Sequence, residues 1–164
     1  MIELNKKTQQ DFLNREWVQR LLDAGVDMSD AKYIIGKLNW TKLDNHDWIA
    51  EKQIDPDELY DILPTYTVSE LLYKLHEWIY PTIDGVEYSG GLKFLKDAPF
   101  YIWYYELKGS IVDSKTNYKS ELNKEDYIYA EFEYPIESLA SLLIQCHKKD
   151  IGIKAKDTGD ISDK

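Results

Sequence analysis

The sequence predicts an α+β protein in which an N-terminal helical segment precedes a two-layer domain of helix, antiparallel three- to four-stranded sheet and helix. Before Pro81, apolar residues recur at helical spacing behind capping residues. After Pro81, the apolar pattern changes to a period of two, which is typical of strands. We therefore expect a helical segment over residues 1–64 packed on the rest, a sheet domain over residues 65–154 and a flexible tail over residues 155–164.

The N-terminal segment has the pattern of a helical hairpin. Thr8 can cap a first helix, and Gly25 suits the left-handed residue that commonly follows a helix end. Ser29 can cap a second helix, in which the apolar run Tyr33–Ile35 continues to Leu38. The pattern predicts two helices with a short joint.

Two further helix starts follow along the chain. In "DPDELYDIL", residues 55–63, the first aspartate can cap a helix and the proline fits its first turn. This helix must stop before Pro64. Thr67 and Glu70 form a capping box, and the apolar spacing after it predicts a helix over residues 68–79.

The sheet is predicted from turn residues between β-prone runs. Asp84-Gly85 is a strong hairpin signal, and Ser89–Gly91 predicts a second turn. Strands are then expected over residues 92–95 and 100–107.

The rest of the sheet domain is predicted to hold a loop, a strand and a helix. Residues 109–124 are polar and predict a loop, whereas residues 127–133 alternate between apolar and polar side chains and predict a strand. Pro135 fits the first turn of a last helix, and Lys149 suits its C-terminal end before Gly152.

The run "PFYIWYYEL", residues 99–107, is apolar on both faces when it is read as a strand. A sheet covered by helices on one side should have one polar face, so this strand breaks the pattern. Either the N-terminal helices cover the second face, or the aromatic side chains are partly open to a partner. The candidate partner or ligand surface consists of Tyr101, Trp103, Tyr105, Tyr129 and Glu131.

Charge and composition exclude several classes of function. The net charge of -10 disfavours direct binding to phosphate backbones. Glu133 and Glu137 make the start of the last helix negatively charged, whereas binding to duplex RNA at this position would require lysines. No apolar stretch has the length of a membrane span, and the N-terminus lacks the apolar run of a signal peptide. The single cysteine, Cys146, favours a reducing compartment, so a cytoplasmic location is expected.

No catalytic or metal motif is recognisable. The three histidines, His46, His76 and His147, lie far apart with no second ligand at metal-like spacing. Cys146 and His147 are adjacent on a helix and point in different directions, which does not make a nucleophile–base pair. The sequence therefore predicts no catalytic residue, cofactor or metal, and favours a protein that is not an enzyme while leaving that question open.

Three stretches together carry a resemblance: "WVQRLLDAGVDMSDA", "LPTYTVSELLYKL" and "PIESLASLLIQCHKKDIGI". With the Tyr- and Trp-rich strands between them, they resemble small proteins of unassigned function encoded by bacterial phages, prophages and mobile elements. The resemblance implies a mobile-element protein in a bacterial cytoplasm. It supplies no active site and no functional residue.

These observations favour an acidic, aromatic-rich accessory protein that binds a host protein or a small neutral or cationic ligand. One alternative is an enzyme whose site is assembled from scattered acidic and aromatic residues. A second is an acidic mimic of nucleic acid, and a third is a structural role as a homo-oligomer.

Overall fold

The computed structural model describes residues 2–3, 12–36, 40–43, 62–112, 114–117, 119–124 and 126–154. Among these residues the helices are α1 (Arg15–Asp23), α4 (Val68–Lys74) and α5 (Pro135–Lys149). The strands are β1 (Ile2–Glu3), β2 (Tyr33–Ile35), β3 (Trp40–Leu43), β4 (Leu63–Thr65), β5 (Trp78–Ile79), β6 (Thr82–Ile83), β7 (Val86–Asp97), β8 (Phe100–Val112), β9 (Lys119–Lys124) and β10 (Tyr129–Phe132). The fold is thus mixed, with helices and antiparallel strands, as predicted.

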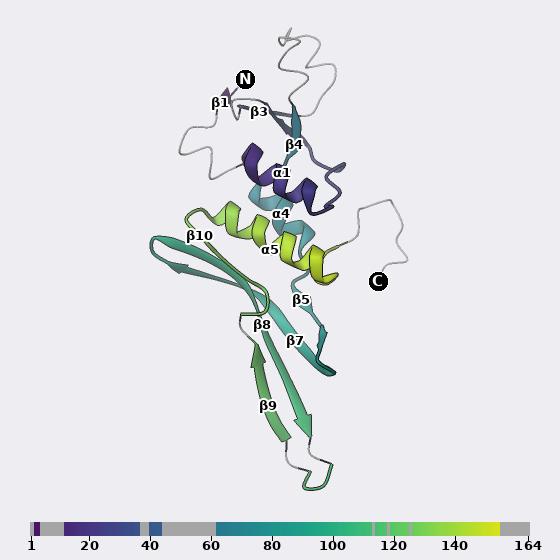
Figure 1. Cartoon of the computed structure of the whole chain (residues 1–164). Coiled ribbons are helices and arrows are strands. Elements are labelled where there is room, and N and C mark those ends of the chain that lie inside the picture. Colours follow the sequence, from purple (N-terminus) through teal and green to yellow (C-terminus); the bar gives the residue numbers. More distant parts are fainter. Residues whose placement is uncertain are drawn as a thin grey trace.

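The strands form two antiparallel sheets at opposite ends of an elongated molecule (Figure 1). The smaller sheet has the order β1-β3-β2-β4. The larger sheet has the order β10-β8-β7-β5, with β6 added beside β7 and β9 beside β8. The β8–β9 hairpin extends away from the helices, at the bottom of Figure 1.

Helix α5 lies at the centre of the core. One side of it contacts β8 and β10, and α1 and α4 pack against it from the side of the smaller sheet (Figure 1). The apolar positions of α5 are buried: Ile136, Leu139, Ala140, Leu142, Leu143 and Cys146. All three helices therefore lie on the same side of the larger sheet. No helix in the described part of the chain is long and apolar enough to cross a membrane.

The predicted N-terminal hairpin of helices is only half correct. Helix α1 begins after Asn14, whose side chain accepts a hydrogen bond from the Trp17 amide, and Thr8 lies outside the described residues. Gly25 follows the helix with a φ of 88°, as predicted. The prediction of a second helix is wrong, because Tyr33–Ile35 forms strand β2 between β3 and β4. Two adjacent β-branched isoleucines favour a strand. Hydrogen-bonded pairing with β3 and β4 on its two sides stabilises this segment as a strand.

The capping box at the start of α4 is confirmed, but the helix is shorter than predicted. Thr67 and Glu70 exchange the expected hydrogen bonds, yet α4 ends at Lys74. The C-terminal segment replaces the next helical turn, because the His76 amide donates to the Gly152 carbonyl and the Lys154 amide donates to the Lys74 carbonyl. The helix predicted over residues 55–63 lies almost wholly outside the described residues, and β4 begins at Leu63.

One of the two predicted turns is confirmed. Asp84 and Gly85 have φ values of 51° and 79° and join β6 to β7, as a tight hairpin requires. The prediction of a turn at Ser89–Gly91 is wrong, because these residues lie inside β7. A Cβ atom on Gly90 would lie 2.6 Å from the carbonyl oxygen of Glu106. This glycine therefore permits close approach of backbones within the sheet.

The predicted loop over residues 109–124 is also wrong. Strand β8 continues to Val112 and pairs with β9 over Lys119–Lys124. The hairpin that results projects into solvent, so neither of its faces needs the apolar alternation by which a strand is recognised. The last strand and last helix are confirmed as β10 and α5, with Pro135 in the first turn of α5.

The role of Gly90 can be tested by comparing two neighbouring glycines. We expect Gly90→Ala to lower the free energy of unfolding by about 2 kcal/mol, because the added methyl group meets the Glu106 backbone and the Leu107 side chain. Gly91→Ala is the control, since its Cβ would only touch Trp78 at 3.4 Å. Urea unfolding measures both variants. Equal losses of stability would contradict this interpretation.

Candidate functional site

The five residues of the predicted surface do not lie together. Tyr129 pairs with Tyr104, and Glu131 pairs with Ile102, so Tyr129 and Glu131 share a face with the even-numbered residues of β8. The predicted residues Tyr101, Trp103 and Tyr105 point to the opposite face, where α5 packs. The sequence prediction had placed all five side by side.

Tyr105 is a core residue and not part of any surface. Its side chain is 0% exposed, and its hydroxyl donates a hydrogen bond to the His76 carbonyl. Burial raises the pKa of Tyr105 above its ordinary value, and the nearby Cys146 adds to this effect. Tyr105 therefore belongs to the contact between the larger sheet and the helices.

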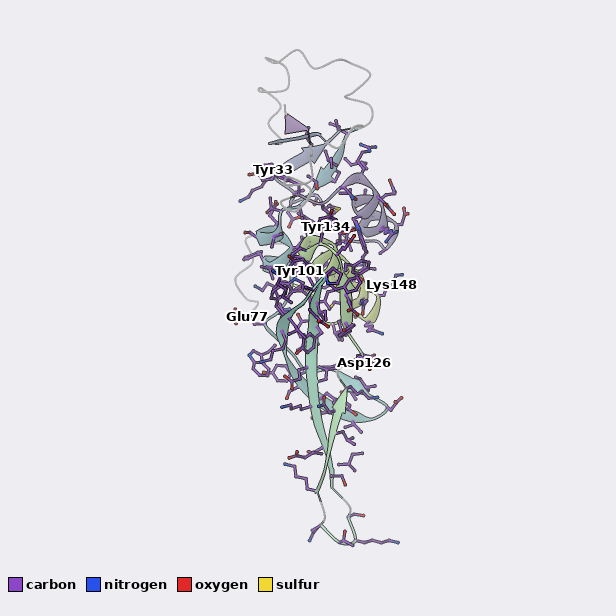
Figure 2. All side chains as sticks on the ribbon, turned by 90° about the vertical axis from the view of Figure 1, so that its left-hand side faces the viewer. Tyr33, Glu77, Tyr101, Asp126, Tyr134 and Lys148 are labelled. Atoms are coloured by element: carbon purple, nitrogen blue, oxygen red, sulfur yellow. The ribbon has the colours of Figure 1, made fainter. Side chains whose placement is uncertain are left out.

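Tyr101 and Trp103 form an aromatic cluster with Phe94 at the end of the β7–β8 hairpin. The ring of Phe94 lies 4.7 Å from that of Trp103 and 6.2 Å from that of Tyr101, and the Lys96 ammonium lies over Tyr101. Figure 2 shows Tyr101 among crowded side chains in the middle of the molecule. The indole nitrogen of Trp103 is buried without a hydrogen-bond acceptor among the described residues. Phe94 is 47% exposed, so this cluster is partly open.

The other side of the larger sheet, which we call the open face, is turned away from α5. No helix or strand in the described ranges lies over it (Figure 1). By strand register its side chains are Trp78, Lys93, Leu95, Asp97, Phe100, Ile102, Tyr104, Glu106, Tyr129 and Glu131. Trp78 is 58% exposed, Leu95 51% and Phe100 41%. Several large apolar side chains exposed on one face can mark an interaction site.

One part of the open face, around Tyr104 and Tyr129, lies beside acidic side chains, whereas Glu106 is paired with the Lys108 ammonium at 3.5 Å. Tyr104 and Tyr129 lie with ring centres 6.1 Å apart, and Glu131 stands beside Tyr129. Partial burial raises the pKa of Tyr129, and the negative charges of Glu131, Asp126 and Asp97 raise it further. These carboxylates give the aromatic pair a field that favours cations.

A hollow of about 840 Å³ lies along β7, β8 and β9. Its lining residues are Tyr80, Glu87, Tyr88, Ser89, Lys108, Gly109, Ser110, Lys119, Glu121, Leu122 and Asn123. By register, the side chains of Ser89, Lys108 and Asn123 point to the same side as the open face. This wide and mostly polar hollow therefore extends the open face toward the tip of the molecule.

The described residues show no arrangement for nucleophilic or metal chemistry. Cys146 is 0% exposed, and burial raises the pKa of its thiol to about 12, so it stays protonated and unreactive. A ring nitrogen of His76 lies 3.2 Å from the Ile153 carbonyl, as expected for a structural histidine. No group of three His, Cys, Asp or Glu side chains in the described ranges could hold a metal ion.

A partly buried charged cluster could not be predicted from the sequence. Lys74 is 7% exposed, and its ammonium lies 2.8 Å from a carboxylate oxygen of Asp30. The Tyr66 hydroxyl donates to the other carboxylate oxygen. Partial burial alone would raise the pKa of Asp30, but the hydrogen bonds from Lys74 and Tyr66 and the Lys74 charge outweigh it and hold that pKa below its usual value. No local pattern connects Asp30 with Lys74, so only the fold reveals the cluster.

Comparisons with known proteins add no relative: no protein-family model matches the chain, and no curated protein or solved structure is significantly similar to it.

The Asp30–Lys74 ion pair leads to a prediction about the pH dependence of stability. We expect Asp30→Asn to lower the free energy of unfolding at pH 7 by about 2 kcal/mol, since it leaves the Lys74 ammonium without its counter-charge. The loss stays below that of a fully buried pair because 36% of the Asp30 side chain is exposed.

The pKa of Asp30 is lower in the folded state than in the unfolded chain. Its contribution is therefore complete above the unfolded value of about 4 and is lost as the pH falls through the folded value. Unfolding by urea from pH 7 to pH 3 should show the wild type and the Asp30→Asn variant converging. A difference in stability that is constant with pH would contradict the ion pair.

Proposed function

We propose that this chain is a non-enzymatic accessory protein whose open face binds a basic, extended segment of a protein partner. In the phage or mobile-element setting that the sequence resembles, this partner would be a host protein. The observation that carries the proposal is a sheet face with exposed aromatic and aliphatic side chains, on which Tyr129 lies near the negative charges of Glu131, Asp126 and Asp97.

The apolar part of the open face supports a macromolecular partner. Trp78 lies flat against Gly91, and more than half of its side chain is exposed. Leu95 and Phe100, which lie beyond Lys93, are further exposed apolar side chains of the same face, near the hairpin end. Aromatic side chains of this kind supply much of the energy of protein interfaces.

The charged part of the open face supports a basic partner. An arginine side chain placed over Tyr104 or Tyr129 would gain a cation–π contact and could reach the Glu131 carboxylate with the same guanidinium group. A phosphate group would meet repulsion from the same carboxylates.

A peptide suits the open face better than a small molecule does. Small-molecule sites are usually concave and bury most of the ligand, whereas this part of the sheet is an exposed face. A short extended peptide can span the row from Trp78 to Tyr129.

The proposal can be tested by titrating ¹⁵N-labelled protein with two synthetic peptides, one alternating Arg with Leu and the other alternating Glu with Leu. We expect the Arg–Leu peptide to shift the amide resonances of Tyr104, Glu106 and Tyr129 and to lose affinity as salt is added. The Glu–Leu peptide should not bind. Shifts that appear elsewhere, or with both peptides alike, would refute a basic partner on this face.

Two variants and one control sharpen the test. The double variant Tyr104→Ser/Tyr129→Ser and the single variant Glu131→Lys should each weaken binding of the Arg–Leu peptide about tenfold. Tyr73→Ser, which changes a 66% exposed tyrosine on α4, should leave binding unchanged. Thermal melting confirms that each variant is folded.

A further inference from the structure

We propose that the outer edge of β7 at residues 93–97 pairs with the same segment of a second copy of this chain, which would join two larger sheets into one. The pairing would be antiparallel and two-fold symmetric about Leu95. It rests on the backbone and charges of one edge strand, and its evidence is separate from that for peptide binding, although Lys93, Leu95 and Asp97 also belong to the open face.

The outer edge of β7 is open over this segment. Strand β5 pairs with β7 at Gly90 and Gly91 and ends there. All of residues 93–97 are exposed, and no strand in the described part of the chain pairs with their outer side. An exposed edge strand is a template for pairing with another chain.

The backbone direction at this edge follows from one hydrogen bond. The Leu92 amide donates to the carbonyl of Glu77, the residue directly before β5. Because β5 lies on the side of β7 opposite to β8, the N–H and C=O groups of Leu92 point away from β8. Backbone direction alternates along a strand, so the N–H and C=O groups of Phe94 and Lys96 also point outward. Those of Lys93, Leu95 and Asp97 point to β8 and are paired there. The edge therefore offers two residues with unpaired backbone groups.

Symmetry about Leu95 satisfies these backbone groups. Phe94 of one copy would lie opposite Lys96 of the second copy, and the two residues would exchange both of their backbone hydrogen bonds. The Lys96 ammonium would stand beside the Phe94 ring of the other copy. Leu95 would lie opposite Leu95 on the open face.

The side-chain charges fit the same register. Lys93 of each copy would lie opposite Asp97 of the other, which makes two cross-strand pairs of opposite charge. Shifting the centre to Lys96 would place two lysines against each other. Shifting it to Phe94 would require the Leu92 amide, which already donates to Glu77. The sequence "KFLKD" is thus self-complementary in one antiparallel register.

Lysines on an edge strand often protect it against pairing. Here the lysines disfavour pairing with other strands but not with a second copy. In the antiparallel register, Lys93 of one copy lies opposite Asp97 of the other, which carries the opposite charge. A foreign strand without this pattern would meet an unmatched lysine. The charges therefore select a second copy as the occupant.

Analytical ultracentrifugation of the full chain tests the proposal. We expect concentration-dependent dimerisation, measured up to about 1 mM because an interface of this length is small. Lys93→Asp and Asp97→Lys should each weaken the dimer about tenfold by placing like charges opposite each other. An equimolar mixture of these two variants should recover wild-type association, since both opposite-charge pairs are restored between unlike chains. A monomer throughout the concentration range, or a mixture that does not recover, would overturn the proposal.

A backbone variant separates edge pairing from other modes of dimerisation. Lys96→Pro removes an outward N–H group and leaves the bonds between β7 and β8 in place, because proline is tolerated at the outer side of an edge strand. It should abolish the dimer while the thermal melting of the monomer stays close to that of the wild type. A Lys96→Pro variant that is folded and still dimeric would refute pairing at this edge. Repeating the peptide titration on this monomer shows whether the open face binds without the dimer.

Discussion

The fold depends on the burial of α5 between the larger sheet and the other two helices. Ile136, Leu139 and Leu143 lose almost all of their exposure, and each such side chain contributes on the order of 2 kcal/mol when it is removed from water. Because α5 contacts β8 and β10 on one side and α1 and α4 on the other, it connects elements that lie far apart in the sequence. The residues after α5 then pair with the end of α4 and fix where that helix stops.

The same arrangement explains why the sheet has one open face. All of the helices in the described ranges stack on the α5 side, so the even-numbered residues of β8 have no covering layer (Figure 1). Ile102 on this face is nevertheless only 3% exposed, and its partners in register are Leu95 and Glu131 on the neighbouring strands. The apolar character of both faces of β8 therefore has two causes. One face is core, and the other carries both buried and exposed apolar side chains, Ile102 and Phe100 among them.

What could be predicted from the sequence was local. Thr67, Pro135 and the Asp84-Gly85 turn signal structure through their own backbone preferences, and each was found as predicted. The errors arise where distant residues decide. Gly90 is a strand residue because of Glu106, and α4 stops because Ile153 and its neighbours pair with Leu75. Nor could the sequence place Tyr101 and Tyr129 on different faces, since that needs the register between β8 and β10.

In the described part of the chain, the helices cover one face of the larger sheet and leave the other face without a covering helix. Hydroxyl-radical footprinting of the full chain, read by mass spectrometry, tests this most directly. We expect rapid oxidation of Trp78 and Phe100 on the open face and protection of the buried Tyr105 and Leu107 on the opposite face. Trp78 and Phe100 protected as strongly as Tyr105 in the monomeric protein would contradict this arrangement.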